Sequence, residues 1–140
     1  MNLNEKETLI AQELNLLTNK KFIYVLNVSE KQLESKWQPS GELLKAIGDN
    51  PYVILCTNLE LYISELSDED RNSTLNELGI SKSGLDSLIK TGYDALNLIT
   101  FLTTGADETR AWTAETNSLI PKASRAIHTD FEKLFIRAEV

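Results

Sequence analysis

Two short, uninterrupted apolar runs, at residues 22–26 and 52–56, constrain the fold of this chain more than any other feature. Both are rich in β-branched and aromatic side chains, as is typical of strands buried on both faces of a parallel sheet. Between them lies a helical pattern that begins at Ser40 and ends at Gly48 and Pro51, both common helix-terminating residues. A helical pattern also follows the second run. The order strand, helix, strand, helix predicts a right-handed crossover and a parallel sheet with ligands at the carboxyl ends of its strands.

The spacing of apolar residues predicts further helices at residues 4–17, 59–66, 67–79 and 83–96. The first begins with Asn4 and Glu7, which form a capping-box pair. The helix at 67–79 has three acidic residues in its first turn, where the helix dipole favours negative charge. Ser83 caps the last helix in combination with an Asp three residues later. The last two helices are interpreted as packing elements.

The pattern changes after residue 97 to shorter β-type runs. Residues 98–104 and 108–113 flank a turn that contains Gly105, and predict a hairpin that starts a different domain. A short helix is predicted at 121–127 and a final strand at 135–140. The C-terminal part of the chain is therefore expected to form a unit distinct from the parallel sheet.

The chain is acidic, with a formal net charge of −7 over 140 residues. This charge disfavours non-specific binding to nucleic acid, which depends on Lys and Arg contacts to phosphates. Residues 101–140 are the less acidic end, with five basic against six acidic side chains. A single cysteine excludes an internal disulfide, and one His leaves no zinc-ligand cluster. Without a signal-peptide pattern or an apolar run of roughly 20 residues, we predict a cytoplasmic protein without membrane contact.

Five segments carry a resemblance to a known family. The segment at 110–140 reads RAWT…P…IHTDFEK.FIRAEV, and upstream come LNLLT at 14–18, FIYVLNVSE at 22–30, ELSDEDR at 65–71 and SGLDSLIKTGYDALNLITF at 83–101. In this order, and over nearly the whole chain, they resemble the C-terminal part of the Obg-like (YchF) ATPases. The segment at 110–140 is similar to the junction between that family's nucleotide-binding domain and its TGS domain.

The resemblance implies three regions: residues 1–18 end a helical coiled-coil insertion, 19–100 form the C-terminal part of a P-loop nucleotide-binding domain, and 101–140 begin a TGS domain. The implied fold class is α/β, a partial GTPase-like (TRAFAC) parallel sheet with helices, followed by an incomplete α+β (β-grasp) TGS domain. The family is implied to hydrolyse ATP with Mg²⁺.

A phosphate-binding loop of the form G-x-x-x-x-G-K-S/T does not occur in the sequence. The backbone amides, Lys and hydroxyl of that loop hold the phosphates and Mg²⁺ in P-loop enzymes. We therefore expect this chain alone to contain no catalytic residues and to bind neither ATP nor Mg²⁺ tightly.

The tetrad Asn-Val-Ser-Glu at residues 27–30 follows the first predicted strand, where GTPases of this class carry Asn-Lys-x-Asp. Val28 replaces the Lys that lies along the base, and Glu30 is one methylene longer than the Asp that accepts two hydrogen bonds from guanine. The resemblance implies adenine recognition instead, by Asn27, Val28 and Glu30 on one wall and Cys56 and Thr57 on the other. The alternative interpretation is an ordinary polar turn after a strand.

By the same resemblance, His128, Lys133 and Arg137 are candidate contacts to RNA or the ribosome. TGS domains in stringent-response synthetases use a comparable His against the end of tRNA, so the large ribosomal subunit and tRNA are candidate partners. His128 is alternatively a structural or surface residue. The family's pattern has glycine at three positions that carry other residues here, Asn117, Arg125 and Leu134, which are less suited to glycine-type turns.

Other conspicuous residues have simpler interpretations. Cys56 is expected to be a small core residue rather than a reactive thiol, because no basic residue adjoins it in the sequence. The acidic run at 65–70 lacks the spacing of an EF-hand and is interpreted as a solvated helix start. Trp37 and Trp112 lack an interleaved basic patch and are interpreted as packing residues.

Three hypotheses about the chain stay open. It is a fragment of a ribosome-associated ATPase, a stand-alone TGS-like module that binds RNA or a ribosomal partner, or a chain that shares its nucleotide site with a separately encoded N-terminal half. Unpaired sheet edges, including the predicted strand at 135–140, would also favour oligomerisation.

Overall fold

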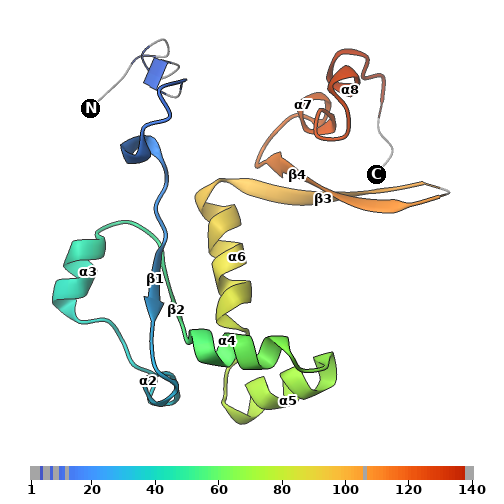
Figure 1. The fold of residues 1–140 in the computed structure, drawn as a ribbon. Helices are drawn as coiled ribbons and strands as arrows, with labels where there is room; N and C mark the ends of the chain where they lie inside the picture. The colour runs from blue at the N-terminus through green and yellow to red at the C-terminus, as the bar shows by residue number, and fades with distance from the viewer. Residues whose placement is uncertain (1–3, 5–6, 8–9, 12, 106, 138–140) are drawn as a thin grey trace.

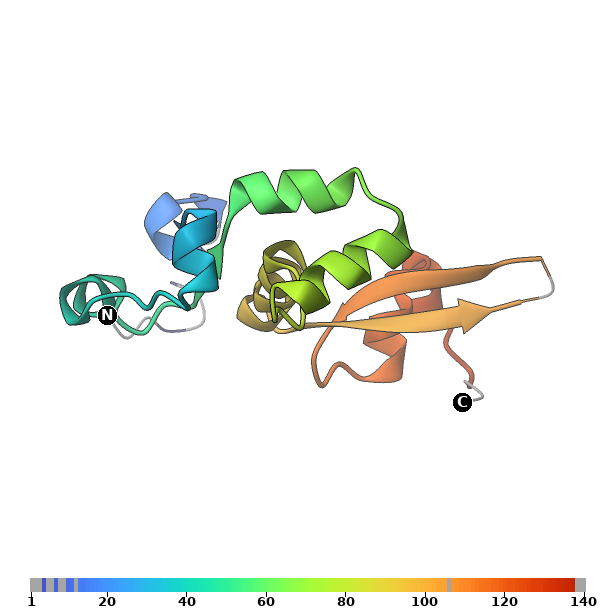
Figure 2. The ribbon, with the colours of Figure 1, turned by 90° about the horizontal axis from the view of Figure 1, so that it is seen from below.

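A computed structural model describes residues 4, 7, 10–11, 13–105 and 107–137 of the chain. Figure 1 shows the order of the elements, and Figure 2 shows the same ribbon from below. In both views the N-terminal strands and the C-terminal hairpin lie on opposite sides of the helix α6, Gly84–Ala95. The two regions are therefore separate layers that a single helix connects.

The first region contains the parallel strands β1, Tyr24–Asn27, and β2, Tyr52–Leu55. They pair in register from Tyr24 opposite Tyr52 to Asn27 opposite Leu55, which confirms the predicted parallel pair. Two helices connect them, α2, Glu30–Glu34, and α3, Gly41–Ile47. The helix α2 was not predicted, because a five-residue helix leaves little periodic pattern in a sequence.

The prediction that both strands are buried on both faces is wrong for β1. Tyr24 and Val25 are 40% and 45% exposed, whereas Val53 and Leu55 of β2 are buried. The sheet has two strands among the described residues, so few neighbouring elements cover β1. Continuous apolar runs belong to strands with layers on both faces, and β1 therefore presents an apolar surface without such a layer.

The helices α4, Thr57–Ser64, and α5, Asp68–Glu77, follow β2 and precede α6. Their inward residues form the core of this region, Cys56, Leu59, Ile63 and Leu75. Cys56 is 2% exposed, which confirms its interpretation as a core residue. The acidic first turn of α5 is exposed, as expected for a solvated helix start.

Four serines fix where helices begin. Ser29, Ser40, Ser67 and Ser83 precede α2, α3, α5 and α6, and each hydroxyl accepts a hydrogen bond from the backbone N–H three residues later. These bonds satisfy amides that have no partner within the helix, and each typically contributes about 1 kcal/mol. The helix starts predicted at Ser40, Ser67 and Ser83 are thus confirmed.

The second region begins with the antiparallel hairpin of β3, Leu98–Thr104, and β4, Thr109–Glu115. The predicted hairpin is confirmed, with β4 beginning one residue later and ending two residues later than expected. Trp112 is half-buried, and its indole N–H donates to Thr103 Oγ1 at 2.8 Å, which agrees with a packing role. The hairpin leads into the short helices α7, Ile120–Ser124, and α8, Thr129–Lys133.

The predicted final strand is not present in residues 135–137, and residues 138–140 lie outside the described part. No strand of the described residues pairs with 135–137, and an extended segment without a partner does not form a sheet. Of the three residues at glycine positions, only Asn117 adopts a positive φ, 62°. Asn tolerates this left-handed conformation better than most residues, so the turn is retained.

The N-terminal helix predicted at 4–17 is confirmed in part, because among the described residues it ends before residue 14. Residues 7, 10, 11 and 13 are helical, and Asn4 and Glu7 exchange two side-chain hydrogen bonds with each other's backbone N–H, at 2.8 and 3.0 Å. The chain turns at residues 14–15 and then forms a short 3-10 helix, η1, Leu17–Asn19. Among the described residues, no helix has the length and apolarity needed to cross a membrane.

Candidate functional site

The carboxyl ends of β1 and β2 lie side by side, as the parallel order predicts. Two hydrogen bonds join them: the Thr57 N–H donates to Asn27 Oδ1 at 3.1 Å, and the Val28 N–H donates to the Leu55 carbonyl at 2.9 Å. The side chain of Asn27 therefore connects the loop after β1 to the first turn of α4. This arrangement brings Asn27, Val28, Cys56 and Thr57 together at one edge of the sheet.

These four residues differ in what they present to a ligand. Val28 and Cys56 are 7% and 2% exposed, so their side chains belong to the interior. Asn27 and Thr57 are exposed. A flat base at this edge would therefore meet the Asn27 amide and the Thr57 hydroxyl, with Val28 supporting the loop from within.

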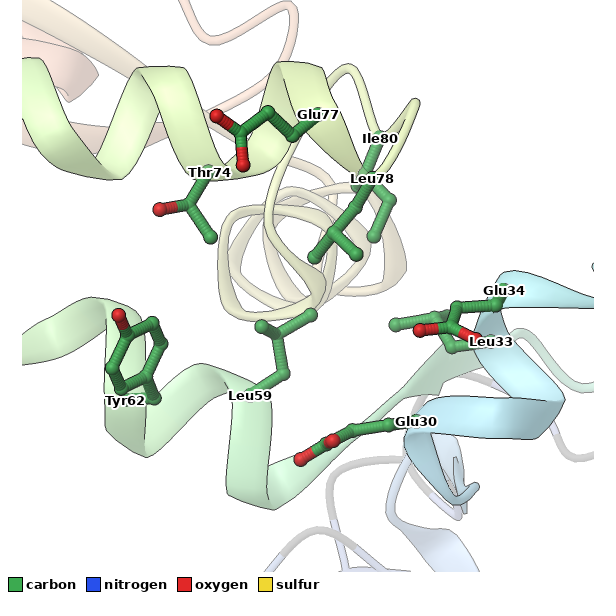
Figure 3. Close-up of a pocket in the computed structure, with 9 residues that line it drawn as sticks. All are labelled: Glu30, Leu33, Glu34, Leu59, Tyr62, Thr74, Glu77, Leu78 and Ile80. Atoms are coloured by element: carbon green, nitrogen blue, oxygen red, sulfur yellow. The ribbon is translucent and has the colours of Figure 1, made fainter.

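Glu30 occupies a different position from the other four candidates. It is the first residue of α2, where Ser29 and Gln32 form a reciprocal capping box. The exposed Glu30 side chain lines a cavity of about 420 Å³ between α2, α4 and α5, shown in Figure 3. Glu30 reaches this cavity from the first turn of α2, a helix that the sequence did not predict, so sequence reasoning could not place it there.

A second set of polar contacts holds α6 against α4 and α5. The Gly84 N–H donates to Glu60 Oε1 at 2.7 Å, and Arg71 Nη2 lies 3.3 Å from Ser83 Oγ and 3.5 Å from Asp86 Oδ2. Ser83 is 1% exposed, so its hydroxyl depends on these partners. Glu60 was not singled out from the sequence, because it lies 24 residues from Gly84 and no local pattern links them.

His128 forms the N-cap of α8. Its Nδ1 accepts a hydrogen bond from the Asp130 N–H at 3.2 Å, and Phe131 lies edge-on to its ring. The same Nδ1 lies 3.5 Å from Asp130 Oδ2, so both the backbone amide and the carboxylate of Asp130 approach this nitrogen. Lys133 ends α8 and Arg137 follows it. His128 is exposed, so it combines a capping role with an accessible ring.

Two groups in the C-terminal region have shifted pKa values. The hydrogen bond and positive charge of Lys122 hold the pKa of Glu115 below its usual value. Hydrogen bonds to Thr113 and Thr100 lower the pKa of Tyr93. Both groups lie away from the sheet edge, and within the described ranges no three His, Cys, Asp or Glu side chains are grouped to hold a metal ion.

Comparisons with known proteins place this mixed α/β fold. The YchF-GTPase_C family, described as a protein of unknown function (DUF933), matches residues 98–140. The chain is 43% identical to "Ribosome-binding ATPase YchF" of Bacillus subtilis (strain 168), over 96% of this chain and 38% of that protein. It is 39% identical to "Obg-like ATPase 1" of Caenorhabditis elegans, over 98% of this chain and 36% of that protein.

The "Structure of the Schizosaccharomyces pombe YchF GTPase" superimposes with a TM-score of 0.80 and 33% identity, over 97% of this chain and 37% of that one. This chain matches the C-terminal region of the YchF/Obg-like ATPase family. It spans less than two-fifths of the length of these relatives. The family resemblance and the fold class expected from the sequence are confirmed.

Proposed function

We propose that this chain supplies the base-binding edge of the nucleotide domain, and the start of the TGS domain, in a ribosome-binding ATPase. Residues 1–18 would end the coiled-coil insertion, 19–100 would belong to the nucleotide domain, and 101–140 would begin the TGS domain. The observation that carries the proposal is the hydrogen bond from the Thr57 N–H to Asn27 Oδ1. It joins the two loops that a base must contact at the carboxyl edge of a parallel sheet.

The composition of this edge favours adenine over guanine. Reading guanine takes a carboxylate at the fourth position of the tetrad that accepts from the ring N–H and the amino group. Here that position is Glu30, whose side chain lines the neighbouring cavity, and Val28 is too short and too buried to lie along the base as Lys does. The Asn27 amide has both a donor and an acceptor, which suits the amino and ring nitrogens of adenine.

Hydrolysis would require phosphate-binding groups outside these 140 residues. The sequence has no G-x-x-x-x-G-K-S/T loop to hold the β- and γ-phosphates and Mg²⁺. A base edge alone forgoes most of the binding contacts of ATP. We therefore expect negligible ATP binding by this chain in calorimetry, and a micromolar dissociation constant would contradict the proposal.

A chimera tests base selectivity directly. The matched region of the B. subtilis relative is replaced by this chain, and ATP and GTP affinities are compared. We expect ATP to bind at least tenfold more tightly, and the double substitution Val28→Lys, Glu30→Asp to shift the preference toward GTP by roughly tenfold, a 1.4 kcal/mol effect. Adenine recognition by this edge would be refuted by a chimera that binds GTP more tightly than ATP. It would also be refuted if the double substitution left the ratio of the two affinities unchanged.

A large apolar hollow supports the assignment of residues 101–140 to an incomplete domain. The hollow measures about 720 Å³ and lies between the hairpin and the α7–α8 segment, with Phe101, Ile120 and Phe131 among its lining. Leu102 and Ile136 are also strongly exposed. Further strands of a TGS domain would cover such a surface. Exposure of a large apolar surface to water is unfavourable.

The alternative function is a stand-alone TGS-like module that binds RNA or a ribosomal partner in the cytoplasm. The observation that favours it is the exposed ring of His128 on the less acidic end of the chain, close in sequence to Lys133 and Arg137. Co-sedimentation with ribosomes at several salt concentrations tests it, because contacts to phosphate weaken as salt rises. Absence of the chain from the ribosome pellet at low salt would count against this function.

A further inference from the structure

The cavity of Figure 3 lies between two facing helices, α4 and α5, and α2 closes one end. Its volume, about 420 Å³, falls within the range of pockets that hold small ligands or a few side chains. The lining consists of Glu30, Leu33, Glu34, Leu59, Tyr62, Thr74, Glu77, Leu78 and Ile80. We call this set the α4–α5 groove.

The apolar wall of the α4–α5 groove is continuous with the core. Leu59 belongs to the buried cluster, and Leu33, Leu78 and Ile80 are half-buried against it. An aliphatic group placed in the groove would therefore extend the existing core instead of resting on an isolated patch. Burial of such a group is favourable in proportion to the apolar area it covers.

The polar part of the groove is entirely acidic or neutral. Glu30, Glu34 and Glu77 line it, and no Lys, Arg or His does. None of these three carboxylates forms an ion pair with any described residue. The surrounding segment, residues 30–77, carries ten acidic side chains against four basic ones, so the local field attracts cations.

A metal ion does not fit this arrangement, because the three carboxylates are not grouped as metal ligands among the described residues. A nucleotide does not fit either, because its phosphates carry the same charge as the groove. Carboxylates spread around an apolar wall suit a ligand that has cationic and aliphatic groups side by side. Lys and Arg side chains combine a charged head with an aliphatic stem, and aliphatic neighbours in a peptide add further apolar area.

We infer that the α4–α5 groove binds a basic, apolar peptide segment of a partner protein. Aliphatic side chains of the peptide contact Leu59, Leu78 and Ile80, while its Arg or Lys residues reach Glu34 and Glu77. This site is distinct from the edge of Asn27 and Thr57 that is proposed to contact adenine, although Glu30, which the sequence predicted at that edge, lines the groove. The inference does not depend on nucleotide binding.

Fluorescence anisotropy with labelled peptides tests the inference on the full chain without nucleotide. The probe is Leu-Arg-Leu-Arg-Leu, compared with Leu-Glu-Leu-Glu-Leu and Gly-Arg-Gly-Arg-Gly. The test variant is Glu34→Gln with Glu77→Gln. The matched control is Glu42→Gln with Glu108→Gln, which removes the same charge from exposed positions outside the groove. Thermal unfolding of both variants checks that the fold is retained.

We expect the first peptide to bind and the other two to bind at least tenfold more weakly. The test variant should weaken binding by about tenfold, because it removes two ion pairs with the peptide, and the control by less than twofold. Equal losses in the two variants would show that only net charge matters and would overturn the inference. Failure of the unmodified chain to bind Leu-Arg-Leu-Arg-Leu would overturn it too, as would equal binding of the glycine peptide.

Discussion

The packing of α6 against β2 depends on the absence of a side chain at Gly84. A Cβ atom built at this position would lie 2.3 Å from Leu55 Cβ, 3.2 Å from Leu55 Cα and 3.0 Å from Glu60 Oε1. Carbon atoms in contact are normally about 3.5–4.0 Å apart, so Gly84→Ala would require α6 to move by about 1 Å. The two Leu55 atoms lie on or next to the backbone and cannot rotate away.

The expected destabilisation follows from these distances. Overpacking a core typically costs about 1–3 kcal/mol, and the rigidity of the Leu55 neighbours places Gly84→Ala near the upper end. A shift of α6 would also lengthen the 2.7 Å bond from the Gly84 N–H to Glu60 Oε1. Gly84 is the first residue of α6, where the higher helix propensity of Ala offsets little of the cost of overpacking. We therefore expect a loss of about 2–3 kcal/mol in the free energy of unfolding.

Urea unfolding followed by far-ultraviolet circular dichroism measures this loss, and Gly92→Ala is the matched control. Gly92 lies inside the same helix, and a Cβ there meets nothing within 4 Å. Replacing this glycine should stabilise the chain by up to about 1 kcal/mol through helix propensity and lower unfolded-state entropy. If the free energy of unfolding of Gly84→Ala lies within about 0.5 kcal/mol of that of the unmodified chain, or equals that of Gly92→Ala, the inferred close contact between α6 and β2 is wrong.

Three further predictions concern single polar contacts. Ser83→Ala should lower the free energy of unfolding by about 1–2 kcal/mol, because it removes the cap of α6 and leaves a partly buried Arg71 without one acceptor. The control is Ser40→Ala, which removes an exposed cap. Equal losses of stability for the two variants in urea titration would show that burial of Ser83 is irrelevant. Asn27→Ala should cost about 0.5–1.5 kcal/mol by leaving the Thr57 N–H without its acceptor, Asn27→Asp should cost less because an oxygen is retained, and equal losses would contradict this. Lys122→Met should raise the pKa of Glu115 back toward its usual value, because Lys122 lowers it. The stabilisation from this pair is present above the ordinary pKa of a Glu and disappears as the pH falls through the lowered pKa of Glu115. Carboxyl NMR titration measures the shift, and an unchanged pKa in the variant would exclude the pair in solution.

Local sequence signals were enough to locate most elements of this fold. The serine caps at Ser40, Ser67 and Ser83 mark helix starts because the cap bonds span only three residues. The hairpin at 98–115 follows from two β-type runs and a turn between them. The parallel order of β1 and β2 likewise predicts that Asn27 lies beside Thr57, as the structure shows.

Contacts between distant residues could not be obtained in this way. The bond from the Gly84 N–H to Glu60, the exposure of β1 and the lack of a strand at 135–137 depend on which elements lie nearby. The α4–α5 groove is of the same kind, because Glu34 and Glu77 are 43 residues apart and meet only through the packing of α2, α4 and α5.

The amino-acid order of this chain is sufficient to indicate the family it resembles, the starts of α3, α5 and α6, and the polar residues that follow its parallel strands, because these depend on short-range patterns. The burial of Val28, the direction of Glu30 and the acidic groove arise only when helices from different parts of the chain pack together. Side-chain burial and the local field are sums over spatial neighbours, and those neighbours are set by the folded arrangement.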